Sequence, residues 1–319
     1  MPPVANAPDR PASARAAIRP LSLALALAAV LGGCSSSPGA PTATSGRLAV
    51  TAAFYPLEFI ATQVGGDRVS VTTLTRPGVE PHDLELTPAD VAGVNSAALV
   101  LHLKGFQSAV DEAVAQQAAG RALDVSAAAR LEPATGPHEQ QGGQPGALDP
   151  HFWLDTDRYA AVARLVADRL AALDPGGAAA YQAGADAFVA KLTGLDSELR
   201  AGLRTCTNRT LVTSHAAFGY LAGRYDLRQV SITGLSPDQE PSARQLAELT
   251  QTVRDAKATT VYTETLVEGR FAQTVAASTG AALAVLDPVE GITSASAGSD
   301  YFAVMRANLA ALRTGQGCG

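Results

Sequence analysis

The sequence predicts an α/β protein with two lobes, each built on a mostly parallel sheet with flanking helices, joined by one long helix. The chain has 319 residues, which suffices for two domains of ordinary size. Hydrophobic residues make up 47% and charged residues 17% of it, a globular composition. Short strand-like runs alternate with helical segments in both halves, a pattern typical of parallel sheets with helical crossovers.

The first half is predicted to contain strands over 47–54, 69–74 and 98–103 and helices over 56–64, 87–95, 106–117 and 156–173. The helix over 87–95 has a clear start, because Thr87 suits the cap, Pro88 the first turn, and Asp90 completes a capping box. Residues 132–148 are rich in Pro, Gly and Gln and lack periodicity, so they are predicted to form a loop.

The long helix is predicted over 178–203, after the break at Pro175-Gly176-Gly177. The second half repeats the alternation, with strands over 210–212, 229–232, 260–262 and 284–286 and helices over 217–225, 243–256, 271–279 and 301–312. The predicted organisation is therefore an N-terminal lobe over 47–174, a connecting helix over 175–204 and a C-terminal lobe over 205–319.

The first 33 residues have the features of an export signal, in which arginines precede an apolar run over 21–31 that is too short for a typical membrane span. The run ends in Leu31-Gly32-Gly33-Cys34, which resembles a bacterial lipobox. We therefore expect a lipoprotein signal peptide over 1–33, a lipid on Cys34, a tether over 34–46, and a location at the outer face of the cell membrane. The alternative is an ordinary secretory signal with an incidental cysteine.

Cys206 and Cys318 are the remaining cysteines. Exported proteins occupy compartments that permit disulfides, so we predict that these two residues pair and hold the C-terminus down. The alternative is two free thiols. The formal net charge of −6 argues against nucleic acid as a partner, because phosphate binding requires a basic surface.

Three of the five histidines, His82, His151 and His215, lie in distinctive polar segments, and Asp287 follows a predicted strand. Neutral imidazole and carboxylate are suitable Zn²⁺ ligands. Their spacing of 64 to 72 residues forms no local zinc motif, so spacing alone leaves each of them open to a structural or solvated role.

Four segments in order together resemble the zinc/manganese-type solute-binding lipoproteins of ABC importers, in their zinc-binding subgroup. These segments are EPHDLELTPAD (80–90), DPHFWLD (149–155), TSHAAFGYLAGRYDL (213–227) and LDPVEG (286–291). The resemblance covers essentially the whole chain after the signal segment. It implies two α/β lobes joined by a rigid helix, with a metal ion bound between them.

The resemblance implies that His82, His151, His215 and Asp287 are the metal ligands. Manganese-binding members of the resembled family have a carboxylate as the third ligand. A histidine at that position here, His215, therefore favours Zn²⁺ over Mn²⁺. Glu80 and Glu264 are further candidates, as carboxylates that support the ligands or as alternative ligands. The competing interpretation makes both of them solvated loop carboxylates.

The implied function is capture of Zn²⁺ outside the cytoplasm and its delivery to an ABC permease by a membrane-anchored, monomeric, non-enzymatic protein. The alternatives are Mn²⁺ or Fe²⁺ import, a surface adhesin, and a zinc hydrolase. The segment His138-Glu139-Gln140-Gln141-Gly142 does not match the H-E-x-x-H motif of zinc hydrolases. Many zinc members have a His-rich loop before the second ligand, whereas residues 132–148 contain only His138, which leaves extra metal binding there open.

Overall fold

The computed structural model describes residues 46–134 and 147–319. The expected signal peptide, the lipid attachment at Cys34, almost all of the tether, and His138 therefore lie outside the described residues. Within the two described ranges, no helix has both the length and the apolar character needed to cross a membrane.

The first lobe is built on a four-stranded sheet in which every pair of neighbours is parallel. Its strands are β1 (Leu48–Ala52), β2 (Val69–Thr73), β3 (Leu99–His102) and β4 (Ala122–Asp124), in the order β2-β1-β3-β4. The carboxyl ends of parallel strands share one edge of the sheet, where ligands of open α/β sheets bind. The loops that follow β2 and β3 start from this edge.

Helices of the first lobe connect these strands and follow the last of them. They are α1 (Tyr55–Gly65), α2 (Pro88–Ser96), α3 (Ser108–Gln117), α4 (Ser126–Ala129) and α5 (Thr156–Leu173), with short 3-10 turns η1 (Gly66–Arg68), η2 (Phe152–Leu154) and η3 (Pro175–Gly177). The capping box predicted for α2 is present, with the Thr87 side chain accepting from the Asp90 N–H and the Asp90 carboxylate accepting from Thr87. Strand β4 and helix α4 were not predicted.

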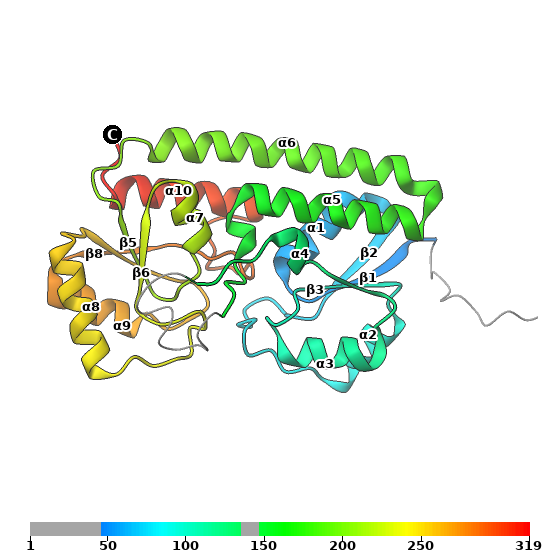
Figure 1. Cartoon of the computed structure of the whole chain (residues 1–319), viewed down its shortest axis with the longest axis horizontal. Helices are drawn as coiled ribbons and strands as arrows, with labels where there is room; N and C mark the ends of the chain where they lie inside the picture. Colours follow the sequence, from blue (N-terminus) through cyan, green and yellow to red (C-terminus); the bar gives the residue numbers. More distant parts are fainter. Residues whose placement is uncertain (1–45, 135–146) are drawn as a thin grey trace, which may run out of the picture. The chain divides into compact units, whose positions relative to one another are not determined.

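The second lobe repeats this topology. Its strands β5 (Thr210–Thr213), β6 (Arg228–Ser231), β7 (Thr260–Thr263) and β8 (Ala282–Val285) form a parallel sheet in the order β6-β5-β7-β8. Its helices are α7 (Gly219–Arg224), α8 (Ala243–Asp255), α9 (Arg270–Thr279) and α10 (Tyr301–Gly315). Two parallel α/β lobes confirm the predicted fold class (Figure 1).

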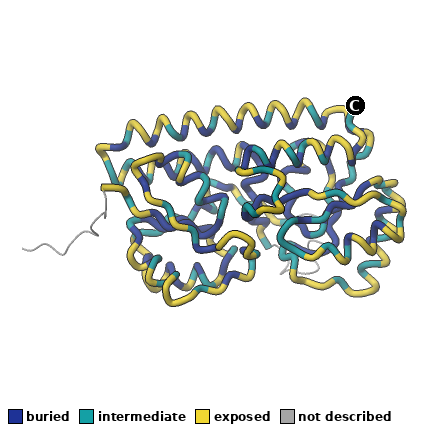
Figure 2. Tube along the Cα trace, turned by 180° about the vertical axis from the view of Figure 1, so that it is seen from behind, coloured by how far each residue is buried: buried dark blue, intermediate teal, exposed yellow. Residues whose placement is uncertain are grey.

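Helix α6 (Ala178–Leu203) has 26 residues and a length of about 39 Å at 1.5 Å per residue. It packs against α1 and α5 of the first lobe and against α10 of the second (Figure 1). Its buried side chains recur every three to four residues along one face, including Phe188, Leu192, Leu195 and Leu199, while the opposite face is exposed (Figure 2). The helix therefore contacts helices of both lobes along one apolar stripe.

Aromatic side chains join helix α10 to the helices of the first lobe. Tyr301 lies 4.8 Å from Tyr159 of α5 between ring centroids, and Phe302 lies 5.7 Å from Phe188 of α6 and 5.9 Å from Phe59 of α1. These rings belong to the larger of two hydrophobic cores. The smaller core is formed by side chains of the second sheet and of helices α8 and α9. Part of the second lobe therefore packs separately.

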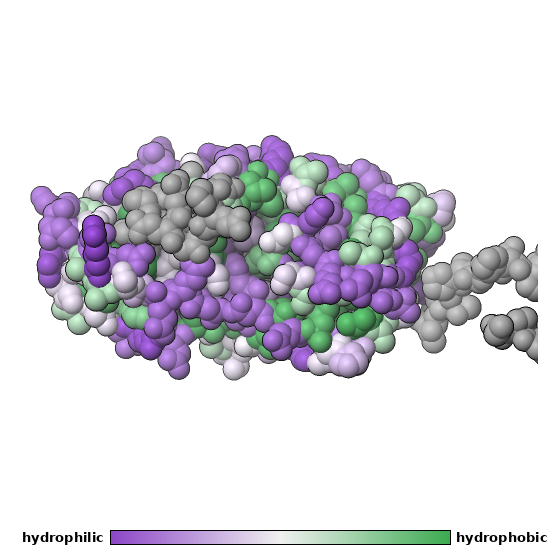
Figure 3. Space-filling view, turned by 60° about the horizontal axis from the view of Figure 1, so that its bottom comes forward, coloured by the Kyte–Doolittle hydropathy of each residue, from purple (hydrophilic) through white to green (hydrophobic). Residues whose placement is uncertain are grey.

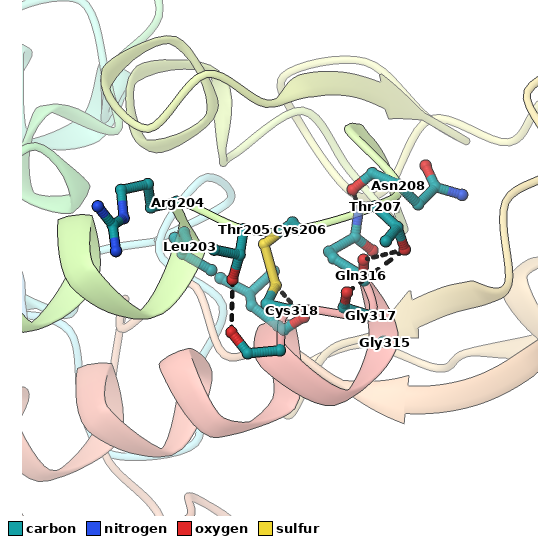
Figure 4. Close-up of a disulfide and its surroundings, with 12 residues drawn as sticks. Leu203, Arg204, Thr205, Cys206, Thr207, Asn208, Gly315, Gln316, Gly317 and Cys318 are labelled. Carbon is teal, nitrogen blue, oxygen red and sulfur yellow. Dashed lines mark hydrogen bonds between the residues drawn. A yellow bond between two sulfur atoms is a disulfide. The ribbon is translucent and has the colours of Figure 1, made fainter.

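The predicted disulfide between Cys206 and Cys318 is present and joins residues 112 positions apart (Figure 4). The hydroxyl of Thr205 donates to the Gly319 carbonyl at 2.6 Å, and the Thr207 N–H donates to the Gly317 carbonyl at 3.3 Å. The bond and these contacts hold the last residues of the chain against the segment between α6 and β5.

Hydrophilic residues predominate on the face shown in Figure 3, and hydrophobic residues form separate patches there. Among the described residues, large hydrophobic side chains are exposed at Val79, Leu148, Leu283 and Val285. Most of the large apolar side chains in the described part of the chain are thus buried in its two cores.

Candidate metal centre

Three histidines and one glutamate converge between the lobes. His82, His151, His215 and Glu290 each offer a ligand atom, and these atoms lie within 4.8 Å of one another. The Glu290 Oε1 atom is 3.1 Å from the Nε2 of His151, 3.2 Å from that of His82 and 3.5 Å from that of His215. The Nε2 atoms of His151 and His215 are 3.3 Å apart. The structure therefore brings together the three predicted histidines, although they lie far apart in the sequence.

Each ligand atom is placed by a loop next to a regular element. His82 follows β2, His215 follows β5 and Glu290 follows β8, so all three lie beyond the carboxyl ends of parallel strands. His151 directly precedes the 3-10 turn η2, whose Phe152 and Trp153 are fully buried. The first lobe contributes two donors and the second lobe contributes two.

Two of the histidines are oriented by a carboxylate on the far side of the ring. The Nδ1 of His151 is 2.7 Å from Asp149 Oδ1, which also accepts the His151 backbone N–H at 2.9 Å. The Nδ1 of His215 is 2.5 Å from Glu264 Oε2, and Glu264 Oε1 accepts the His215 backbone N–H at 2.9 Å. Such contacts fix the tautomer and leave Nε2 for a metal. Glu264 thus faces the outer nitrogen of His215 and not the centre of the cluster.

His82 is held in another way. Its backbone N–H donates to Glu80 Oε2 at 2.9 Å, and its ring packs edge-on against Phe106 with 4.7 Å between centroids. Within the described ranges, no carboxylate contacts its Nδ1. Its side chain is 9% exposed, against 2% for Glu290 and 0% for His151 and His215, and it lines a cavity of about 450 Å³. His82 is therefore the solvent edge of the cluster.

Glu80 lies beside His82, with its Oε1 4.0 Å from the His82 Nε2. This oxygen is buried and has no hydrogen-bond partner in the described part of the chain. Burial, reinforced by the nearby Glu290, raises the pKa of Glu80 to about 8. Glu80 is close to the cluster without belonging to it.

The structure places Glu290, and not Asp287, at the fourth position, which corrects the expectation from the sequence. Asp287 Oδ1 accepts the Val289 N–H at 2.8 Å, and its own N–H donates to Asn308 Oδ1 at 2.9 Å. Val289 then adopts a left-handed φ of 59°, a strained conformation for a β-branched residue. The chain turns there and directs Glu290, the next residue and the third after Asp287, toward the histidines. Both acids lie in the segment LDPVEG, where the resemblance implied Asp287 as the ligand and did not indicate Glu290.

The protonation of the cluster is set by competing effects. Burial acts to lower the pKa of His151, but Asp149 and Glu290 outweigh it and the pKa is raised. For His215 burial is likewise outweighed, by Glu264 and Glu290, and the pKa is raised well above its ordinary value. Burial lowers the pKa of His82. Burial acts to raise the pKa of Glu290, but its three histidine neighbours hold it well below the ordinary value.

This donor set suits a Zn²⁺ ion. Zinc prefers four ligands in tetrahedral geometry, drawn from imidazole nitrogen, carboxylate oxygen and thiolate. Three imidazoles and one carboxylate converge here, and two of the imidazoles have the outer carboxylate that metal-binding histidines usually have. A buried set of acids and bases of this kind is typical of a binding site for a cation.

Comparisons with known proteins agree with this chemistry. The family described as "Zinc-uptake complex component A periplasmic" matches residues 50–315. The high-affinity zinc uptake system protein ZnuA of Bacillus subtilis is 32% identical over 291 residues, which cover 88% of this chain and 91% of that protein. The zinc-binding lipoprotein AdcA of Streptococcus pneumoniae is 34% identical over 92% of this chain and 60% of its own length. The laminin-binding protein Lmb of Streptococcus agalactiae, described as having adhesin and metal-transporting activity, superposes with a TM-score of 0.75 at 29% identity, covering 85% of this chain and 99% of that one.

Proposed function

The chain belongs to the periplasmic zinc-uptake complex component A family, and from this premise we propose that it captures Zn²⁺ outside the cytoplasm and delivers it to an ABC permease. The observation that carries the proposal is the convergence of four donor atoms from both lobes within 4.8 Å. In this proposal His82, His151, His215 and Glu290 are the ligands. Asp149 and Glu264 orient two of the imidazoles.

Capture, and not catalysis, is the role that this geometry supports. A catalytic zinc site keeps one coordination position for water, beside three protein ligands. Here the protein supplies four donors, and all four side chains are at most 9% exposed. A bound ion would be enclosed until the lobes or the loop of His82 move, which suits transfer of the ion to a partner.

The sequence also supports attachment of the protein to the membrane through a lipid. The segment Leu31-Gly32-Gly33-Cys34 supports lipid attachment at Cys34, with a tether that leads to β1. We expect Cys34→Ser to release the exported chain from the membrane fraction without changing zinc binding. A variant that stays in the membrane fraction would contradict the anchor.

The direct test is the zinc stoichiometry of the chain from Ser35 on, after metal removal, with Zn²⁺ and Mn²⁺ in competition. We expect one tightly bound Zn²⁺ per chain, preferred over Mn²⁺, and loss of binding in His215→Ala. His102→Ala is a matched control, because His102 is also buried but pairs with Asp111, outside the cluster. Tighter binding of Mn²⁺ would overturn the choice of zinc, and absence of stoichiometric metal would overturn the site.

A second candidate function is adhesion, which the structural likeness to the laminin-binding protein of Streptococcus agalactiae favours. Surface plasmon resonance with immobilised laminin tests it, and His215→Ala separates adhesion from metal capture. Saturable binding by both forms would establish a second role that does not depend on zinc. No binding by either form would remove this candidate.

A further inference from the structure

We propose that helix α7 is the positioning element of the zinc site, because it holds in place the Asp149 carboxylate that orients His151. The helix belongs to the second lobe, whereas Asp149 and His151 belong to the first. The inference rests on the proposed zinc-binding function and assigns the residues Gly219 and Tyr220 a role in it.

The first turn of α7 lies directly against Asp149. A Cβ atom built on Gly219 would lie 2.8 Å from Asp149 Oδ2, closer than real Cβ atoms approach other heavy atoms. Any side chain at position 219 must therefore displace this carboxylate or move the helix. Asp149 is 5% exposed, so its carboxylate has little free space to move into. Glycine at 219 is what allows Asp149 to sit under His151.

Tyr220, the next residue of α7, holds the backbone of Asp149. Its hydroxyl donates to the Asp149 carbonyl at 2.9 Å and accepts the Glu132 N–H at 2.8 Å. The Arg158 guanidinium stacks over the Tyr220 ring, 4.2 Å from its centroid, and so fixes the ring from the first lobe. Both the side chain and the main chain of Asp149 are thus placed by consecutive residues of α7.

The far end of α7 is anchored to the same segment of the first lobe. The Arg224 guanidinium contacts Asp155 at 3.2 Å and Asp157 at 2.8 Å, and its Nε contacts Asp196 of α6 at 2.8 Å. Asp155 caps helix α5 directly after the turn that follows His151. Helix α7 is therefore fixed at both ends to the segment that contains His151.

The same helix begins four residues after His215, so one short element links the two buried histidines. If α7 shifts, the carboxylate on the Nδ1 of His151 shifts with it, and the distance between the two Nε2 atoms changes. Partners of this kind on a metal-binding histidine typically contribute about 10- to 100-fold in metal affinity. We expect an effect of that size from a perturbation at Gly219.

The test compares two glycines of the same helix. Gly219→Ala is expected to weaken Zn²⁺ binding about 10- to 100-fold, measured by competition with a chromophoric chelator. Gly223→Ala makes the same chemical change, but its Cβ meets no atom within 4 Å, so its affinity should equal that of the wild type. Visible absorption of the Co²⁺-loaded protein should change in Gly219→Ala and not in Gly223→Ala. Equal zinc affinity and equal Co²⁺ spectra in the two variants would overturn the proposal.

A double-mutant cycle identifies the route of the effect. If Gly219 acts through Asp149, Gly219→Ala should have no further effect on zinc affinity in an Asp149→Ala background. Additive losses would show that Gly219 acts elsewhere and would overturn the proposal. Should Gly219→Ala fail to fold, Tyr220→Phe takes its place, with reduced zinc affinity and an altered Co²⁺ spectrum expected and wild-type values contradicting the proposal. Failure of the wild type itself to bind zinc would instead overturn the proposed function.

Discussion

The segment around His151 and the loop around His82 both belong to the first lobe, yet they present their imidazoles differently. His151 is fully buried, has Asp149 on its Nδ1, and is supported by α7 of the other lobe. His82 lies at the solvent edge, and its loop is fixed through a backbone hydrogen bond to Glu80. His215 resembles His151, with Glu264 as its carboxylate. The cluster thus has a fixed side, formed by His151 and His215, and a less constrained side at His82.

The largest expected effect is loss of a ligand from the fixed side. His151→Ala should lower zinc affinity by more than the about 10- to 100-fold typical of losing an outer partner, because it removes a donor and leaves Asp149 buried without its imidazole. His82→Ala should cost less, because water can reach that edge and take the vacant position. Isothermal titration of both variants tests this order. A greater loss in His82→Ala would contradict the division into two sides.

The second prediction concerns the disulfide, which should affect folding and not the metal centre. The Cys206–Cys318 bond lies beyond the amino end of β5, whereas His215 follows the carboxyl end of the same strand. Replacing both cysteines by serine should lower the free energy of unfolding by about 2–5 kcal/mol, as removal of native disulfides generally does. Denaturant unfolding measures this cost, and zinc titration at a temperature where the variant is folded should give wild-type affinity. A large loss of affinity would show that the two ends of the strand are coupled.

The third prediction compares two glutamates next to ligands. Glu264→Gln should weaken zinc binding about 10- to 100-fold, because it removes the charge that holds the Nδ1 proton of His215. Glu80→Gln should have a smaller effect, since Glu80 contacts the backbone of His82 and not its Nδ1. Chelator competition with both variants tests the contrast. Equal losses would mean that Glu80 supports His82 as strongly as Glu264 supports His215.

Much of the architecture could be predicted from the sequence because the signals were long or periodic. Helices α5 and α6 begin and end where the apolar periodicity and the Pro175-Gly176-Gly177 break predicted. Strand β4 has only three residues and α4 only four, too few for a period to be recognised. The parallel pairing of the sheets followed from the alternation of strands and helices, but the number of strands in the first sheet did not.

The metal centre was predictable for the histidines and not for the carboxylate. The three histidines stood in distinctive segments, so their convergence could be expected from the resemblance. The choice between Asp287 and Glu290 depends on the left-handed φ of Val289, a conformation that a β-branched residue rarely adopts and that no local pattern predicts. The contact of α7 with Asp149 was equally hidden, because it joins residues 70 positions apart and depends on a missing Cβ.

The last prediction is the pH dependence of zinc binding, which separates the two sides of the cluster directly. Their carboxylate partners raise the pKa of His151 and of His215, so zinc has to displace protons from these two rings over a higher pH range than from a free imidazole. Zinc affinity should therefore rise with pH and fall by about tenfold per pH unit for each proton displaced as the pH is lowered. Burial lowers the pKa of His82, so this residue loses its proton at a lower pH than the other two and adds less to the slope. Zinc titrations between pH 6.5 and 8 should thus give the same slope in His82→Gln as in the wild type and a shallower slope in His151→Gln. A flattened profile in His82→Gln alone would place the displaced protons on the solvent edge and reverse the assignment of the two sides.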